Sequence, residues 1–125
     1  MLDIDFFKKI NDTYGHDTGD VVIKEVSNIL VEKTRENDVL GRLGGEEFGI
    51  FLLNSNIEET FKIAQRIKDK IQQTPVINNE NSINITVSIG ISLKNENTKT
   101  LLELIKEADI NLYEAKQTGR NKIVF

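Results

Sequence analysis

The chain has 125 residues, of which 38% are hydrophobic and 29% charged, and its formal net charge is −4. This length and composition predict one globular domain with its own core. The sequence contains no cysteine, which excludes disulfides, zinc–thiolate sites and thiol nucleophiles. The acidic balance argues against broad nucleic-acid binding, and no apolar run approaches the length of a membrane span. We therefore expect a cytoplasmic domain without direct membrane contact.

The first third of the sequence predicts a strand end followed by two helices. Residues 1–4 resemble the end of a strand, and Asp5 is expected to cap a short helix over about 6–11. Residues 11–20 are rich in turn formers. A longer helix is expected from about residue 17 or 19 to 35, because apolar residues recur at helical spacing. That stripe consists of Val22, Val26, Ile29 and Leu30.

Two glycines and two glutamates separate a pair of strand-like runs, 38–43 and 48–53. The Gly44-Gly45 pair predicts a tight two-residue hairpin, because the favoured hairpin turns need a positive φ. Carboxylates at the start of a buried strand are costly unless something pairs with them, and Mg²⁺ is a suitable partner. The alternative is a polar hairpin tip at which Glu46 and Glu47 are solvated.

The rest of the sequence alternates helices and strands. A helix over 57–73 precedes Pro75, and Ile85, Val87, Ile89 and Ile91 alternate with small polar residues, as in a strand. Strands and helices therefore mix in an α+β fold, with helices packed on a sheet that contains antiparallel strands. The remaining expected elements are a hairpin or loop over 76–82, a strand over 83–93, a polar loop over 95–99, a helix over about 100–117 with Leu101, Leu104, Ile105, Ala108, Leu112 and Ala115 inward, Gly119 as its C′ residue, and a strand over 122–125.

Four polar stretches point to a nucleotide site. Strand alternation places Asp3 and Asp5 on one face with Ile4 opposite. The polar residues of 11–20, the Glu46-Glu47 pair and the segment 116–121 complete the set. Together they supply carboxylates for a divalent metal, a helix N-terminus for phosphate, cations, and side chains that can read a base edge. This combination suits a nucleoside triphosphate with Mg²⁺. Alternatively, the basic side chains only complement a helix C-terminus.

The same residues resemble the GGDEF domain of bacterial diguanylate cyclases. The resemblance covers essentially the whole chain, and its blocks occur in the family's order. It implies a palm-like fold related to nucleotidyl cyclases and the ferredoxin-like folds, with a central, mostly antiparallel sheet. The matching blocks are Asp3-Ile4-Asp5-Phe6-Phe7-Lys8-Lys9-Ile10-Asn11-Asp12, Gly15-His16, Gly19-Asp20, Gly44-Gly45-Glu46-Glu47-Phe48, Thr86-Val87-Ser88-Ile89-Gly90, Ala108-Asp109, Tyr113-Glu114-Ala115-Lys116 and Gly119-Arg120-Asn121.

The resemblance implies condensation of two GTP molecules into cyclic di-GMP and two pyrophosphates. Mg²⁺, or Mn²⁺ in its place, would be bound by Asp3, the Ile4 carbonyl oxygen and Glu46, with Glu47 as an additional ligand. Glu46 is also the implied base for the GTP 3′-hydroxyl. By strand alternation we expect Glu46 and Glu47 to point to opposite faces. The implied substrate-binding residues are Asn11 and Asp20 for guanine, His16 beside the nucleotide, and the Phe6 and Phe7 amides, Lys116 and Arg120 for phosphate.

An Arg-x-x-Asp pattern precedes the glycine pair. Arg35 and Asp38 match the family's product-inhibition site, where an arginine can grip a phosphate or a guanine edge. Arg66 matches a further arginine of that site. The alternative for Arg66 is a solvated charge on a helix face. The resemblance thus implies feedback inhibition by cyclic di-GMP.

Family domains extend further at the N-terminal side. We therefore expect residues 1–125 to be a single GGDEF-like catalytic domain without its N-terminal helix and part of the first strand. The resemblance also implies a homodimer for catalysis and an upstream sensory domain. A non-catalytic module that binds GTP or cyclic di-GMP is the alternative function.

Overall fold

The computed structural model describes residues 1–95 and 100–125. Of the polar loop expected over 95–99, residues 96–99 lie outside this description. The helices are α1 (Phe7–Tyr14), α2 (His16–Lys33), α3 (Ile57–Gln73) and α4 (Leu101–Gln117). The strands are β1 (Leu2–Ile4), β2 (Val39–Arg42), β3 (Glu47–Phe51), β4 (Val76–Asn78), β5 (Asn81–Ile83), β6 (Val87–Gly90) and β7 (Ile123–Val124). The α+β expectation is confirmed.

The main sheet has the order β2-β3-β1-β6-β7. Its central strand, β1, pairs antiparallel with β3 on one side and with β6 on the other, and only β6 and β7 run parallel. Asp3 stands opposite Glu47 of β3 and Ser88 of β6. The first residues of the chain are therefore the link between the glutamate turn and the second half of the sheet.

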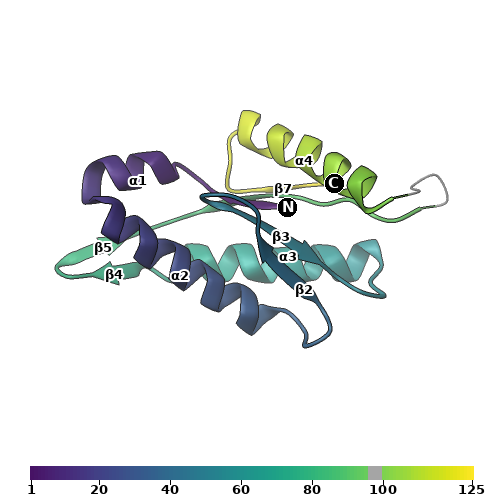
Figure 1. The fold of residues 1–125 in the computed structure, drawn as a ribbon, viewed down its shortest axis with the longest axis horizontal. Coiled ribbons are helices and arrows are strands. Elements are labelled where there is room, and N and C mark those ends of the chain that lie inside the picture. Colours follow the sequence, from purple (N-terminus) through teal and green to yellow (C-terminus); the bar gives the residue numbers. More distant parts are fainter. Residues whose placement is uncertain (96–99) are drawn as a thin grey trace.

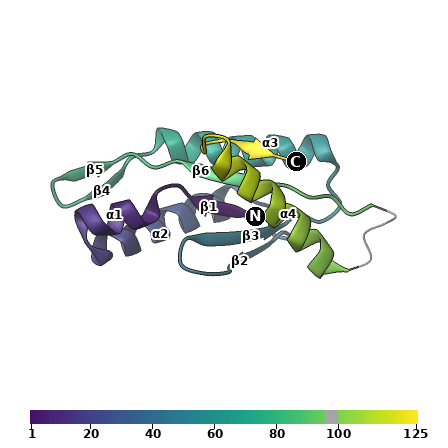
Figure 2. The same cartoon turned by 90° about the horizontal axis from the view of Figure 1, so that it is seen from above.

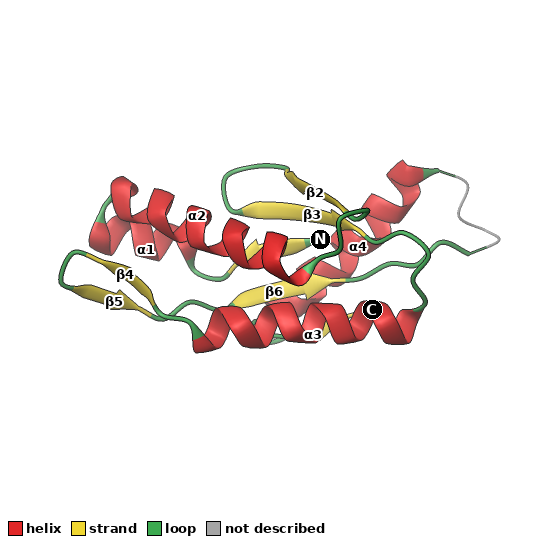
Figure 3. Ribbon diagram, turned by 90° about the horizontal axis from the view of Figure 1, so that it is seen from below, coloured by secondary structure: helices red, strands yellow, loops and turns green. Residues whose placement is uncertain are grey.

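Helices cover the two faces of this sheet unequally, with α4 on one side and α2 and α3 on the other (Figures 1 and 2). The α2–α3 face holds the main hydrophobic core, to which β1 contributes Leu2 and Ile4. The predicted alternation in β6 is confirmed, because Ile85, Val87, Ile89 and Ile91 are all buried. The short β4–β5 hairpin lies beside α2 and away from the main sheet (Figure 3).

Three local expectations are wrong. Residues 11–20 are mostly helical, because α1 continues to Tyr14 and only Gly15, with a φ of 88°, separates it from α2. Phe6 rather than Asp5 is the N-cap of α1, and no side chain among the described residues caps this helix. The strand expected over 83–93 is shorter, because Ile83 pairs within the β4–β5 hairpin and only Val87–Gly90 joins the main sheet.

The glycine pair does not form a two-residue hairpin. Four residues, 43–46, connect β2 to β3, and neither Gly44 nor Gly45 has a φ in the left-handed region. Instead, Leu43 N–H donates to the Glu47 carbonyl at 2.9 Å, and the Arg42 guanidinium donates to the Gly45 carbonyl at 2.8 and 3.0 Å. Glu46 belongs to this connection, and only Glu47 belongs to β3. The expectation that strand alternation points the two glutamate side chains to opposite faces therefore does not apply.

Helix α4 is buried along its C-terminal half only. Ala108, Leu112 and Ala115 are buried as expected, whereas Leu101 and Ile105, which we expected inward, are 57% and 38% exposed. The helix crosses β6 and leaves the sheet toward its N-terminus (Figure 2). Gly119 follows the helix with a φ of 119°, which confirms its C′ role. No described helix is long and apolar enough to cross a membrane.

Candidate active site

Asp3 lies at the centre of the candidate site. It is 4% exposed, in the middle of the central strand, and its Oδ2 lies 2.7 Å from Lys116 Nζ near the end of α4. The predicted facing is confirmed, because Asp3 and Asp5 both bond to residues on the α4 side while Ile4 is part of the opposite core. The fold thus brings together residues 113 positions apart, as the difference 116 − 3 shows.

Glu46 and Glu47 add negative charge beside Asp3. Glu47 stands opposite Asp3 in the β1–β3 register, and the Ile4 amide donates to the Glu46 carbonyl at 3.3 Å. Burial raises the pKa of Asp3 from its usual 3.8 to about 6, the two glutamates add to this rise, and Lys116 opposes it. Three carboxylates therefore share one region in which Lys116 is the neighbouring cation.

The chemistry of these donors fits a hard divalent cation. A metal ion would relieve the excess negative charge around Asp3 and keep that carboxylate ionised. In the described residues, however, no three acidic or histidine side chains converge closely enough to hold a metal. Instead, the Asp3 carboxylate forms an ion pair with Lys116. The donors fit by type and charge, and metal binding would require them to move closer together.

The predicted phosphate-binding groups lie next to one another. Phe6 has a φ of 57° as the N-cap of α1, and the first turn of this helix carries no acidic residue. The Arg120 guanidinium lies 4.7 Å from the centroid of the Phe6 ring. Because the N–H groups at a helix N-terminus attract anions, this end of α1 and Arg120 together form an electropositive corner. Phe7 is partly buried and packs on the main core.

Of the two predicted guanine-binding residues, Asn11 packs against Gly19, the residue directly before Asp20. Asn11 of α1 lies against Gly19 of α2 so closely that an added Cβ there would be 1.9 Å from Asn11 Oδ1. This oxygen is buried and has no hydrogen-bond partner in the described chain. Asp20 follows Gly19 and is exposed, and His16 is exposed at the start of α2. The structure therefore shows an unused acceptor at Asn11, and the joint role of Asn11 and Asp20 stays a prediction.

The predicted inhibitory residues form a separate surface. Asp38 accepts from the Arg35 amide at 2.9 Å, so the Arg-x-x-Asp segment is a local turn. A pocket of about 460 Å³ is lined by both Arg35 and Arg66, and a second of about 230 Å³ is lined by Arg35 and Asp38. Neither pocket includes Asp3, Glu46 or Lys116.

Sequence reasoning missed the partners of Asp5. This aspartate is 3% exposed, and it accepts hydrogen bonds from Thr86, Ser88 and Asn121. The available signal was the polar face of the strand expected over 83–93, where Thr86 and Ser88 interrupt an apolar run. The contact between the Arg42 guanidinium and the Gly45 carbonyl was also missed. No sequence pattern distinguishes Arg42 from any other arginine in a strand.

A strand-centred acidic pair, a basic helix end and an α+β sheet are features of palm-type nucleotidyl cyclases. Residues 1–122 match the family model described as "Diguanylate cyclase, GGDEF domain". Diguanylate cyclase A of Treponema denticola is 42% identical over 123 residues, which cover 98% of this chain and 33% of that protein. The chain therefore spans about a third of this relative's length.

Solved structures agree with the sequence match. The active GGEEF domain of a diguanylate cyclase from Vibrio cholerae has a TM-score of 0.90 and 34% identity, and the match covers 98% of this chain and 78% of that one. The GGDEF domain of DgcB from Caulobacter crescentus, solved in complex with c-di-GMP, has a TM-score of 0.91 and 30% identity, covering 98% and 73%. This chain belongs to the diguanylate cyclase GGDEF-domain family, and the expected palm-like fold is confirmed.

Proposed function

We propose that this chain is a diguanylate cyclase that condenses two GTP molecules into cyclic di-GMP and two pyrophosphates. The observation that carries the proposal is the buried Asp3 carboxylate, paired with Lys116 and beside Glu46 and Glu47. A buried carboxylate with two further, half-buried carboxylates beside it is costly for stability and is typical of a site that binds a charged substrate. Since GTP is abundant in the cytoplasm, we place the reaction there.

The acidic residues would bind the divalent metal. Asp3 and Glu46 are the proposed carboxylate ligands, the Ile4 carbonyl oxygen assists, and Glu47 is an additional ligand. When bound, Mg²⁺ or Mn²⁺ supplies Lewis-acid stabilisation of the charge on the reacting phosphate. Glu46 directly follows Gly45, whose carbonyl accepts from Arg42, and it is also the proposed base for the 3′-hydroxyl.

The nucleotide would lie between α1, α2 and the end of α4. The amides around Phe6 and Phe7, with Lys116 and Arg120, bind the triphosphate and stabilise the charge that develops during transfer. The Watson–Crick edge of guanine carries N–H donors, which suit the unpartnered Asn11 Oδ1 and the exposed Asp20 carboxylate. His16 would lie beside the bound nucleotide.

The proposed reaction needs two subunits. The 3′-oxygen of one GTP attacks the α-phosphorus of the other, the bond from that phosphorus to the β-phosphate bridging oxygen breaks, and pyrophosphate leaves. Glu46 accepts the 3′-hydroxyl proton. Repetition of the step in the opposite sense closes the ring, so we propose a homodimer with the two sites facing each other. An upstream sensory domain would control this pairing.

We further propose product inhibition through Arg35, Asp38 and Arg66. The support is the pocket of about 460 Å³, whose lining includes Arg35 and Arg66 but none of the proposed catalytic residues. Arginine forks onto phosphate and guanine edges, both of which cyclic di-GMP offers twice. The Arg35→Ala variant should lose cyclic di-GMP binding and keep GTP binding. The Lys24→Ala variant, at an exposed lysine that lines neither pocket, is the matched control and should bind both nucleotides normally. Normal product binding by Arg35→Ala would contradict this assignment.

A second candidate is a receptor that binds GTP or cyclic di-GMP without turnover. The observation that favours it is that the described carboxylates do not converge into a metal site. Incubation with GTP and Mg²⁺ at high protein concentration, followed by chromatographic separation of the nucleotides, tests both candidates. Cyclic di-GMP from the parent and from the exposed-site control Glu58→Gln, but none from Glu46→Gln, would support the cyclase. Nucleotide binding without any product would support the receptor.

A further inference from the structure

Asp5 joins three segments that are distant in the sequence. Its Oδ1 accepts from Ser88 Oγ at 2.7 Å, and its Oδ2 accepts from Thr86 Oγ1 at 2.7 Å and from the Asn121 amide at 3.0 Å. Its own amide donates to the Thr86 carbonyl at 2.9 Å. Because both carboxylate oxygens are occupied by neutral donors in a site that is 3% exposed, Asp5 differs from Asp3, whose partner is a cation.

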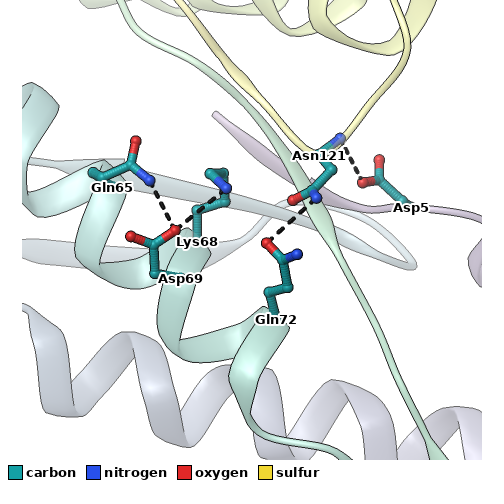
Figure 4. Close-up of polar contacts among 6 residues, drawn as sticks. All are labelled: Asp5, Gln65, Lys68, Asp69, Gln72 and Asn121. Carbon is teal, nitrogen blue, oxygen red and sulfur yellow. Dashed lines mark hydrogen bonds and ion pairs between the residues drawn. The ribbon is translucent and has the colours of Figure 1, made fainter.

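The segment that Asp5 holds has an unusual backbone. Three successive residues after α4 have positive φ values, namely 119° at Gly119, 61° at Arg120 and 49° at Asn121. Side chains other than glycine seldom adopt this conformation, so surrounding contacts must maintain it. The Arg120 amide donates to the Ala115 carbonyl at 2.9 Å, and Asn121 is bonded to Asp5 through its amide and to Gln72 through its side chain (Figure 4).

This turn sets the position of Arg120. The guanidinium lies 4.7 Å from the Phe6 ring centroid, and Phe6 directly follows Asp5 at the start of α1. Asp5 is thus connected to both halves of the electropositive corner, to Phe6 through the chain and to Arg120 through Asn121. A change at Asp5 that frees Asn121 would let Arg120 move relative to the helix N-terminus.

We propose that Asp5 is a positioning residue for the triphosphate group, and that it acts by holding Arg120 against the N-terminus of α1. This inference rests on the proposed function of the site. It gives Asp3 and Asp5 separate tasks, although they lie two residues apart on one face. Asp3 provides charge at the reacting centre, and Asp5 fixes the cation that receives the phosphates.

The first test compares Asp5→Ala with Asp5→Asn by titration calorimetry with GTP and Mg²⁺. Alanine removes all three side-chain hydrogen bonds and keeps the backbone bond to Thr86. We expect GTP to bind about tenfold more weakly, since misplaced binding groups lose their interaction. Asparagine can still accept from Thr86 and Asn121 through its oxygen and donate to Ser88, so binding should stay within about threefold of the parent. The Ile29→Val variant in the opposite core controls for a general loss of stability.

The second test asks whether Asp5 acts through Arg120. If it does, Asp5→Ala combined with Arg120→Ala should weaken GTP binding by less than the product of the two single effects. If Asp5→Ala fails to fold, Thr86→Val replaces it, because this change removes one hydrogen bond to Asp5 Oδ2. Thr86→Val alone should weaken GTP binding about threefold. Combined with Arg120→Ala, it should again weaken binding by less than the product of the two single effects. Multiplying effects, or unchanged binding in these variants, would overturn the proposal.

The remaining outcomes separate this inference from the proposed function. Equal losses in Asp5→Ala and Asp5→Asn, together with a higher Mg²⁺ requirement, would make Asp5 a metal ligand and overturn the positioning role. A parent that binds GTP but makes no cyclic di-GMP would contradict the cyclase alone, and the binding constants would still decide the role of Asp5. An active parent with an unaffected Asp5→Ala variant would contradict this inference alone.

Discussion

The two faces of the central sheet differ more than any other two regions of this molecule. On the α2–α3 face, β1 and β6 present Leu2, Ile4, Val87 and Ile89 to a continuous hydrophobic core. On the α4 face, Asp3 of β1 pairs with Lys116 near the end of α4, and Asp5, directly after β1, accepts from Asn121 in the turn that follows. From β6, Ser88 donates to Asp5 and Gly90 lies against α4. The same two strands therefore contribute one face to the hydrophobic core and the other face to the candidate site.

Because successive side chains of a strand point to opposite faces, one set of residues in β1 and β6 packs in the core and the other set is polar. Residues on the core face gain from burial, about 25 cal/mol for each Å² of apolar surface. Buried polar residues on the other face are tolerated only because each has a specific partner. The α4 face should therefore be sensitive to the loss of single partners, and the core face to changes in volume. The predictions below test this difference.

The largest effect is expected from Gly90→Ala. A Cβ at this position would lie 2.1 Å from the Ala108 carbonyl oxygen and 2.2 Å from the Leu112 amide nitrogen, and neither backbone atom can rotate away. Helix α4 would have to move off β6, at a cost of about 3 kcal/mol or more. Chemical denaturation measures this loss. Gly41→Ala is the matched control, because an added Cβ there meets nothing within 4 Å, and equal losses in both variants would refute the packing argument.

The second prediction concerns Lys116→Met. Without the ammonium group, Asp3 keeps its burial and its two glutamate neighbours, so its pKa should rise beyond about 6. At pH 7 the unpaired carboxylate should cost about 2 kcal/mol of stability, and the cost should shrink at pH 5, where Asp3 takes up a proton. Denaturation at both pH values measures it. Lys62→Met removes an exposed pair with Glu58 and should cost little at either pH.

The third prediction is a pH dependence that comes from Asp3. A carboxyl whose folded pKa is about 6 and whose unfolded pKa is 3.8 favours the folded state below pH 3.8, and this contribution is lost as the pH rises through 6. The loss should be about 1.5 kcal/mol, roughly half of the free energy that the full shift corresponds to, because solvent screens part of the charge. Asp3→Asn should flatten the stability profile between pH 4 and 7. Asp12→Asn, at an exposed residue, should leave the slope in place, and an unchanged slope in Asp3→Asn would contradict the assignment.

Periodicity was enough to predict most of the fold. The limits of α3 and the alternation in β6 follow from apolar spacing and agree with the structure. The turn at Gly44 and Gly45 was predicted wrongly. The Arg42 guanidinium bonds to the Gly45 carbonyl and stabilises a longer connection, and no local sequence pattern encodes that contact. The prediction that Leu101 and Ile105 point inward was wrong for a related reason. Helical spacing identifies an apolar side but not how much of it meets the sheet.

For the candidate site, the residue types were predictable and their partners were not. Asp3, Glu46 and Lys116 were identified through a family resemblance, and their proximity depends on a strand register that only the fold provides. Asp5 was interpreted as a helix cap, the commonest role for an aspartate before a helix. Its actual donors come from residues 81 to 116 positions away, which no local rule could anticipate.

The smallest effect is expected from Ile89→Val, one residue before Gly90 and on the opposite face. Ile89 is 5% exposed within the main core, so the loss of one methylene should cost about 1 kcal/mol. Because the core face does not contact the proposed nucleotide site, GTP affinity should be unchanged. Gly90→Ala, which adds a single carbon on the α4 face, should weaken GTP binding as well, since Lys116 and Arg120 depend on the position of α4. If Ile89→Val instead lost GTP affinity in step with its stability, the two faces of the sheet would be coupled. Packing in the hydrophobic core would then help to shape the site.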